Sequence, residues 1–196
     1  QVINIPFTVG GGVKTLQHAR DILLCGADKV AINTGAVKNP KIITELMELF
    51  GRQCIVVAVD VKRNYNVSGQ KNVFTDNGKK FWFEVFIYGG KKETGIDAIE
   101  WTKKMESLGA GEILLTSMDK DGTKSGFDNE LLNKITTKIS IPVIASGGVG
   151  TLEHMYEGVV EGGASALLAA SIFHFGEYRI QDVKRYLADK KIPVRI

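Results

Sequence analysis

Asp60 follows an apolar run, a position from which a carboxylate could take part in acid–base chemistry. Residues 57–59 form an apolar run that ends in Asp60. Burying a carboxylate at the end of an apolar strand costs free energy unless the carboxylate is paired with another group or faces a solvent-filled opening. We therefore expect Asp60 to act as a general acid or base. The alternative is a salt bridge to Lys62 or Arg63.

Two glycine turns could bind anions. Residues 11–18 (GGVKTLQH) recur as residues 147–154 (GGVGTLEH), and each copy lies between an apolar run and a helical pattern. Backbone N–H groups at the start of a helix attract anions. Because the turn occurs twice, the sequence predicts a substrate with two phosphate groups.

A polar loop, residues 116–126, follows a later strand and could deliver hydroxyls, N–H groups and carboxylates, or be a solvated turn. Asp119 and Asp121 are the only acids of this loop, too few for a calcium-binding loop, so we expect no metal. We also expect no cofactor. His18 and His154 occupy equivalent places in the two repeats, which favours surface or packing roles. No Ser-His-Asp or Cys-His set can be argued from the order of residues.

Composition restricts the class of protein. The chain has 196 residues and a formal net charge of +3, and its densest basic runs are lysine pairs, which argues against nucleic-acid binding. Residues 166–173, the longest apolar stretch, fall short of the roughly 20 residues of a membrane span. We therefore expect no membrane association and a cytoplasmic location, with Cys25 and Cys54 as buried thiols.

These residues need a framework of alternating strands and helices, which is typical of an α/β protein. Six apolar runs without polar alternation predict strands buried on both faces, at residues 5–9, 29–33, 54–60, 112–118, 142–146 and 166–170. Helical patterns follow at residues 15–25, 40–50, 96–108, 129–139, 152–161 and 180–190. Pro40 suits a first helical turn, Asp97 and Asp128 suit helix starts, and residues 171–175 suggest a short extra helix.

The spacing of the repeats predicts a (β/α)8 TIM barrel with a half-barrel internal duplication. The two copies lie four strand–helix units apart, which is half of such a barrel. Only six of eight units are found, so we expect the first two to precede Gln1 and residues 1–196 to form one incomplete barrel domain. An open doubly wound sheet is the competing fold.

One long connection, residues 62–94, interrupts the pattern. Residues 72–75 and 80–87 are strand-like and flank Asp76-Asn77-Gly78, a hairpin turn signal. The sequence thus predicts a β-hairpin insertion on the catalytic face. Its Phe81, Trp82 and Phe83 are expected to pack against the barrel rim more than to touch substrate.

The chain resembles the cyclase subunit of imidazole glycerol phosphate synthase, in the HisA/HisF superfamily. The resemblance covers nearly the whole chain, and its most specific pieces are residues 6–12 (PFTVGGG), 26–30 (GADKV), 109–117 (GAGEILLTS), 121–123 (DGT) and 145–148 (ASGG). It implies that ammonia from a partner glutaminase in a heterodimer converts phosphoribulosyl-formimino-AICAR-phosphate into imidazole glycerol phosphate and AICAR in histidine biosynthesis.

The resemblance also implies roles for individual residues. Asp60 would be the acid–base aspartate of the fifth barrel strand. Gly12, Asn33 and Thr34 would hold one phosphate with Asp121 and Gly122 close by, Gly148, Ala170 and Ser171 would hold the other, and Thr116, Ser146 and Gly147 would contact substrate. Asp28 would face the glutaminase, with Lys29 and Glu112 at the ammonia entrance.

One departure affects the expected activity. The family's second catalytic aspartate belongs to the first barrel strand, which would precede Gln1, so we expect the 196 residues alone to be inactive. The alternatives are the sister isomerase of the pathway, a cyclase-like paralogue that amidates a surface sugar, and a non-catalytic phosphate-binding or docking fragment.

Overall fold

The computed structural model describes residues 3–195, and its sheet is a curled row of six parallel strands. Along the sheet these are β1 (Thr8–Gly10), β2 (Lys29–Ile32), β3 (Ile55–Asn64), β7 (Glu112–Ser117), β8 (Val143–Ser146) and β9 (Ala166–Leu167). The spatial order of these strands equals their order in the chain, which is the arrangement of a barrel wall and not of a doubly wound sheet. The fold is a partial (β/α)8 barrel.

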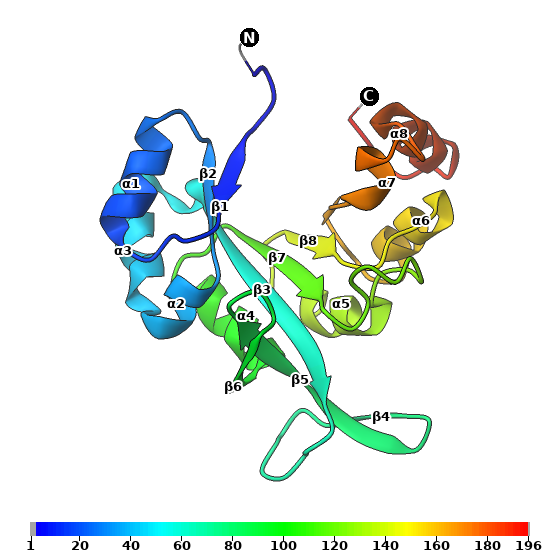
Figure 1. Cartoon of the computed structure of the whole chain (residues 1–196), viewed down its shortest axis with the longest axis horizontal. Helices are drawn as coiled ribbons and strands as arrows, with labels where there is room; N and C mark the ends of the chain where they lie inside the picture. The colour runs from blue at the N-terminus through cyan, green and yellow to red at the C-terminus, as the bar shows by residue number, and fades with distance from the viewer. Residues whose placement is uncertain (1–2, 196) are drawn as a thin grey trace.

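Helices flank this wall. They are α1 (Leu16–Leu24), α2 (Thr34–Lys38), α3 (Lys41–Phe50), α4 (Ala98–Ser107), α5 (Asn129–Thr136), α6 (Leu152–Val160), α7 (Ser171–His174) and α8 (Ile180–Asp189), with a 3-10 turn, η1, at Arg52–Cys54. Of these, α2 and α7 follow strands β2 and β9, and each lines a cavity. Figure 1 shows α1, α2 and α3 on one flank, α5, α6 and α8 on the other, and the sheet curling between them. Amphipathic spacing explains their packing, since α3 buries Ile42, Ile43 and Leu46.

Helix caps confirm the internal repeat at the level of single atoms. The Thr15 hydroxyl accepts a hydrogen bond from the His18 N–H, and the Thr151 hydroxyl accepts one from the His154 N–H, each at 3.2 Å. These are equivalent positions of the two copies, so both glycine turns enter their helices in the same way. Asp97 and Asp128 are N-caps as expected, whereas Pro40 precedes the first turn of α3 and is not part of it.

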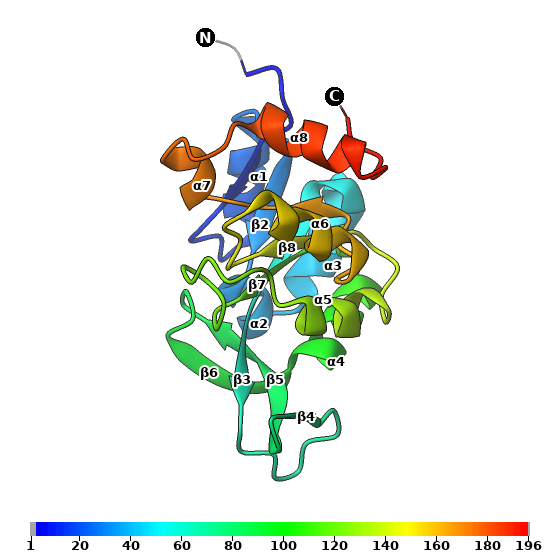
Figure 2. The same cartoon turned by 90° about the vertical axis from the view of Figure 1, so that its right-hand side faces the viewer.

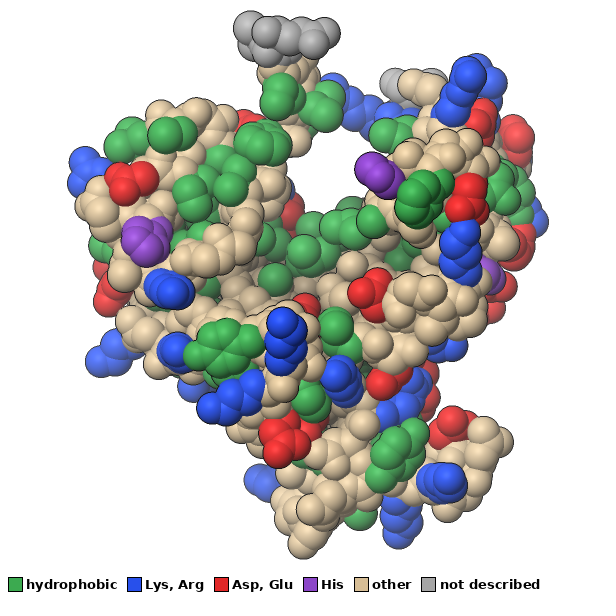
Figure 3. Space-filling view, viewed as in Figure 1, with side chains coloured by type: hydrophobic (Ala, Val, Ile, Leu, Met, Phe, Trp, Pro, Cys, Tyr) green, Lys and Arg blue, Asp and Glu red, His purple; other side chains and the backbone are tan. Residues whose placement is uncertain are grey.

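The strands are less uniformly buried than the sequence suggests. Along β7 the side chains alternate between half-buried and buried. Outward-facing residues such as Ile113 and Leu115 are covered by helices, while Leu114 and Thr116 face the concave side. Figure 3 shows the molecule hollowed between its two flanks, with apolar side chains inside the hollow. Burial on both faces, expected from the apolar runs, is therefore wrong for the concave face.

The predicted hairpin is present. Strands β4 (Phe74–Asp76) and β5 (Lys79–Ile87) pair antiparallel, and β5 also pairs antiparallel with the end of β3. Phe81, Trp82 and Phe83 are at most 2% exposed, so they are packing residues. The tip of this hairpin, β4 with the start of β5, forms an arm that extends away from the rest of the molecule in both views (Figures 1 and 2). A further strand, β6 (Lys92–Asp97), is not predicted by the sequence, because residues 96–97 also fit the start of the helical pattern at 96–108.

Some element limits and burial expectations were wrong. Strand β1 begins at Thr8, not at residue 5. Strand β9 contains only two residues, because beyond Leu167 a single backbone hydrogen bond, from the Leu168 N–H to the Ala145 carbonyl, continues its pairing with β8. Cys25 is exposed at the end of α1 and Cys54 is half-buried, so neither is the buried thiol expected. Over residues 3–195, no helix is both long and apolar enough to cross a membrane.

Candidate functional site

Asp60 lies on β3 at the carboxyl side of the barrel wall. Its Oδ2 accepts a hydrogen bond of 2.9 Å from Asn33 Nδ2, at the end of β2. Burial raises the pKa of the Asp60 carboxyl, the Asn33 hydrogen bond opposes this rise, and the charge of Asp121 adds to it. A carboxyl with a raised pKa keeps its proton to higher pH, which suits a group that exchanges protons with a substrate.

The strands beside Asp60 bring two hydroxyls to the same level. Sheet register pairs Asp60 with Thr116 and Thr116 with Ser146. In-register neighbours of parallel strands point to the same face, so this row crosses the concave side of the wall. The alternative for Asp60, a salt bridge to Lys62 or Arg63, does not form in the described structure, because Lys62 donates to the Gly90 carbonyl and Arg63 pairs with Asp128.

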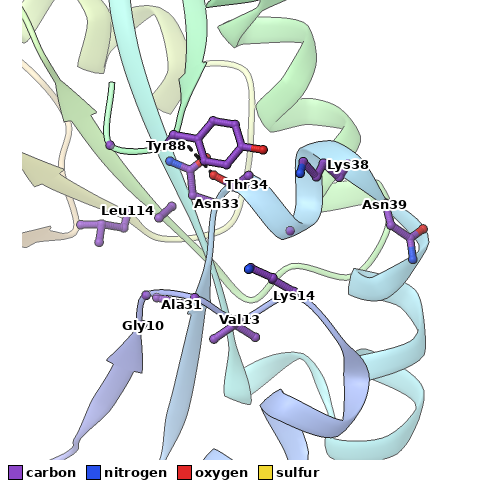
Figure 4. A pocket seen from close by; sticks show the side chains of 15 residues that line it. Gly10, Val13, Lys14, Ala31, Asn33, Thr34, Lys38, Asn39, Tyr88 and Leu114 are labelled. Carbon is purple, nitrogen blue, oxygen red and sulfur yellow. Dashed lines mark hydrogen bonds between the residues drawn. The ribbon is translucent and has the colours of Figure 1, made fainter. Parts of the chain in front are cut away.

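A first cavity, of about 590 Å³, opens beside the first glycine turn. Gly12, Asn33 and Thr34, which the resemblance assigns to one phosphate, all line it, and Figure 4 shows Asn33 and Thr34 there. Gly11 and Gly12 also line it and have φ of +95° and +71°, values that other residues rarely adopt. The Thr34 hydroxyl accepts a 3.1 Å hydrogen bond from the Tyr88 N–H, which joins α2 to the β5–β6 turn, residues 88–91.

Two lysines and a tyrosine at this cavity were missed by sequence reasoning. Lys14 and Lys38 line it, and Figure 4 shows Lys14 extending toward the space below α2. Lys38 Nζ lies 5.1 Å from the centre of the Tyr88 ring, and contact with Lys38 lowers the pKa of the Tyr88 phenol, with the charges of Lys92 and Lys14 adding to the effect. Lys14 lies two residues after Gly12 within the first repeat, a signal that could have identified it.

A second cavity, of about 150 Å³, opens beside the second glycine turn. Its lining includes seven residues that the resemblance assigned to the substrate, together with Lys124: Asp121, Gly122, Lys124, Ser146, Gly147, Gly148, Ala170 and Ser171. Asp121 and Gly122 were expected close to the first phosphate, yet they line this second cavity. The physical reason is the hydrogen bond of 2.9 Å from the Gly126 N–H to the Gly148 carbonyl, which joins their loop to the β8–α6 turn and not to the end of β2.

Charged residues of two strands meet at the opposite, amino end of the barrel wall. Lys29 starts β2 and Glu112 starts β7, and the two side chains form a salt bridge past β3, with 27% and 22% of their side chains exposed. Asp28 is exposed beside them and accepts a 2.7 Å hydrogen bond from the Phe7 N–H. The structure therefore separates these three residues from both cavities.

Comparison with known proteins agrees with this geometry. Residues 1–179 match the model of the family described as "Histidine biosynthesis protein". The chain is 61% identical to the imidazole glycerol phosphate synthase subunit HisF of Nitrosopumilus maritimus, over all of this chain and 74% of that protein. It is 55% and 57% identical to the HisF subunits of Methanosarcina mazei and Methanocaldococcus jannaschii, over 98% of this chain and 71% and 72% of theirs. The chain belongs to the HisF family.

Other candidate groups contribute less to this HisF site. His154 Nδ1 accepts a hydrogen bond from the Gly150 N–H and supports the second glycine turn, while His18 and His174 are exposed. Within residues 3–195, no group of three or more His, Cys, Asp or Glu side chains is arranged to hold a metal ion. The groups that the structure brings to the concave face and the two cavities are Asp60, hydroxyls, lysines and glycine backbone.

Proposed function

We propose that this chain is the cyclase part of imidazole glycerol phosphate synthase and acts on a substrate with a phosphate at each end. The observation that carries the proposal is the order of groups along the sheet. The first cavity lies at β1 and β2, Asp60 is on β3, and the second cavity lies at β8 and β9. An extended bisphosphate held at both cavities would cross Asp60, where its reacting atoms would meet the acid–base group.

Both ends of this substrate would be bound as anions. At the first cavity the phosphate would meet the N–H groups of Gly11 and Gly12 with the ammonium groups of Lys14 and Lys38. At the second it would meet Gly148 and the Ser171 hydroxyl at the start of α7. N–H groups and lysine side chains are common phosphate ligands, so each cavity has suitable donors.

Asp60 would move protons during the reaction. Ammonia attacks the substrate, the imidazole ring closes, and the products are imidazole glycerol phosphate and AICAR. Addition of ammonia to a carbonyl, loss of water and ring closure all require proton transfers. A raised pKa lies closer to neutral pH, where a carboxyl can both donate and accept a proton, so the upward shift of the Asp60 pKa suits this role. The hydrogen bond from Asn33 would fix the orientation of the Asp60 carboxyl.

The ammonia would come from a glutaminase subunit. We place this partner at the amino end of the wall, where Asp28 is exposed, and place the ammonia entrance at the Lys29–Glu112 pair. The proposal also includes two further strand–helix units that complete the barrel and bring a second acid–base carboxylate. The relatives compared above are longer than this chain, which spans 71–74% of their length.

The test is turnover by the full-length gene product with phosphoribulosyl-formimino-AICAR-phosphate and ammonium salt. We expect imidazole glycerol phosphate and AICAR in equal amounts, and much lower turnover in the Asp60→Asn variant. A matched control is Asp21→Asn, an exposed carboxylate on α1 that lines neither cavity. Binding of the substrate without any product, in the presence of ammonia, would contradict the proposal and favour a phosphate-binding module.

A further inference from the structure

Arg63 connects the hairpin arm to the loop of the second cavity. It lies on β3, three residues after Asp60. Its Nη1 and Nη2 donate to the two carboxylate oxygens of Asp128 at 2.6 and 3.0 Å, and Nη2 lies 3.4 Å from Glu130 Oε2. Its backbone N–H donates to Asp119 Oδ2 at 2.8 Å. One residue therefore binds three acids of the β7–α5 region.

The hairpin encloses the guanidinium group. Phe81 and Phe83 of β5 lie with their ring centres 5.1 and 5.2 Å from Arg63 Cζ, and the two rings meet edge to face. The Arg63 side chain is 15% exposed and that of Asp128 is 3% exposed. A bidentate pair held away from water is strong and directional, and loss of one partner leaves a buried charge.

Asp119 and Asp128 are the two ends of the loop that forms one wall of the second cavity. Between them lie Asp121, Gly122 and Lys124, which line that cavity. Asp128 also accepts a hydrogen bond of 3.1 Å from the Ser117 hydroxyl and caps α5. Arg63 thus holds the loop at its start and at its end, while the cavity residues lie in the span between.

We propose that Arg63, enclosed by the hairpin, is a positioning residue that fixes the β7–α5 loop, residues 118–128, in the shape that receives one phosphate of the substrate. This rests on the proposed function, in which the second cavity binds a phosphate group. It also gives the insertion a purpose, because Phe81 and Phe83 shield the Arg63 guanidinium from water. The first cavity has no part in this network, since its lining residues come from β1, the β1–α1 turn, β2, the α2 segment and the β5–β6 turn, together with Ala58 and Leu114.

The experiment measures phosphate binding at each cavity separately in the full-length protein. Inorganic phosphate is titrated while the amide NMR signals of Gly12 and Gly148 report on the first and second cavities. Arg63→Met should weaken binding at Gly148 by about tenfold or more and leave binding at Gly12 within about twofold. Arg63→Lys should lie between, because it keeps the charge and loses the bidentate fork.

Two further variants keep the test informative. Asp119→Ala removes the hydrogen bond from the Arg63 N–H, and because the Asp119 side chain is 37% exposed, this variant should fold even if Arg63→Met does not. We expect it to weaken phosphate binding at Gly148 by about threefold. Arg20→Met, an exposed arginine on α1, is the matched control and should change neither site.

The outcomes separate this inference from the proposed function. If the wild-type protein binds phosphate at Gly148 and both Arg63→Met and Asp119→Ala bind it within twofold of wild type, the positioning role is overturned and the cyclase proposal stands. Equal weakening at Gly12 and Gly148 would also overturn it, because a general loss of structure would then explain the effect. If the wild-type protein binds phosphate at neither cavity, the proposed function itself fails.

Discussion

The two glycine turns are equivalent in sequence but not in surroundings, so the same substitution should have different effects. Gly12 has φ +71°, and in the described structure no heavy atom lies within 4 Å of where an alanine Cβ would be. Gly148 has φ +96°, and a Cβ there would lie 2.2 Å from the Gly126 carbonyl oxygen and 2.8 Å from Lys120 Cβ. Gly12→Ala therefore tests backbone strain alone, and Gly148→Ala adds a clash with the β7–α5 loop.

The magnitudes follow from these contacts. Gly12→Ala should destabilise the protein by about 1–2 kcal/mol, the cost of a left-handed conformation for a residue with a Cβ. Gly148→Ala carries at least that cost, because its φ lies outside the left-handed well, and it must also displace a backbone carbonyl. We expect a loss of about 4 kcal/mol or more, together with loss of phosphate binding at the second cavity.

Urea unfolding measured by circular dichroism gives both values, provided that the slopes agree between the variants. The Gly12→Ala midpoint should lie well above that of Gly148→Ala. Similar losses for both variants would show that the β8–α6 turn is not packed against the β7–α5 loop as described, and the argument from the close approach of Gly148 and Gly126 would be wrong.

Three further results are expected. Lys14→Met and Lys38→Met should each weaken phosphate binding at the first cavity by about fivefold to tenfold at low salt and less at high salt, measured by calorimetry; no salt dependence would argue against a role of these charges. Asp60→Asn should be more stable than wild type at neutral pH. Because burial raises the Asp60 pKa in the folded state, the wild type loses stability as pH rises through that pKa, so the difference should vanish near pH 4 and appear toward pH 7 in thermal melts; a difference that grows toward acid pH would contradict this sign. Glu112→Gln should reduce glutamine-dependent turnover more than turnover with added ammonium salt, since it alters the pair with Lys29 and not the cavities; equal losses would refute the entrance role.

Most of the barrel wall follows from the sequence, for physical reasons that are easy to state. Apolar runs separated by amphipathic helices give a parallel α/β order, and each of the duplicated glycine turns lines one of the two cavities. Asp60 could be found because a carboxylate at the end of an apolar strand is unusual.

The features that were missed depend on contacts between distant segments. Tyr88 reaches the first cavity because β5 runs back antiparallel to β3 and because the Tyr88 N–H donates a hydrogen bond to the Thr34 hydroxyl. Asp121 belongs to the second cavity because Gly126 bonds to Gly148. The partner of Arg63 could not be chosen from its sequence neighbours, since Asp128 lies 65 residues away and is brought close by the pairing of β3 with β7.

The most direct test of the central claim compares catalysis with binding in Asp60→Asn of the full-length protein. The account predicts that kcat with ammonia falls by about 10²-fold to 10⁴-fold, the usual contribution of a general acid or base. Affinity for the bisphosphate substrate should stay within about threefold of wild type, because the phosphate donors lie in the two cavities and not at Asp60. Turnover close to that of the wild type would contradict the account, since another group would then transfer the protons.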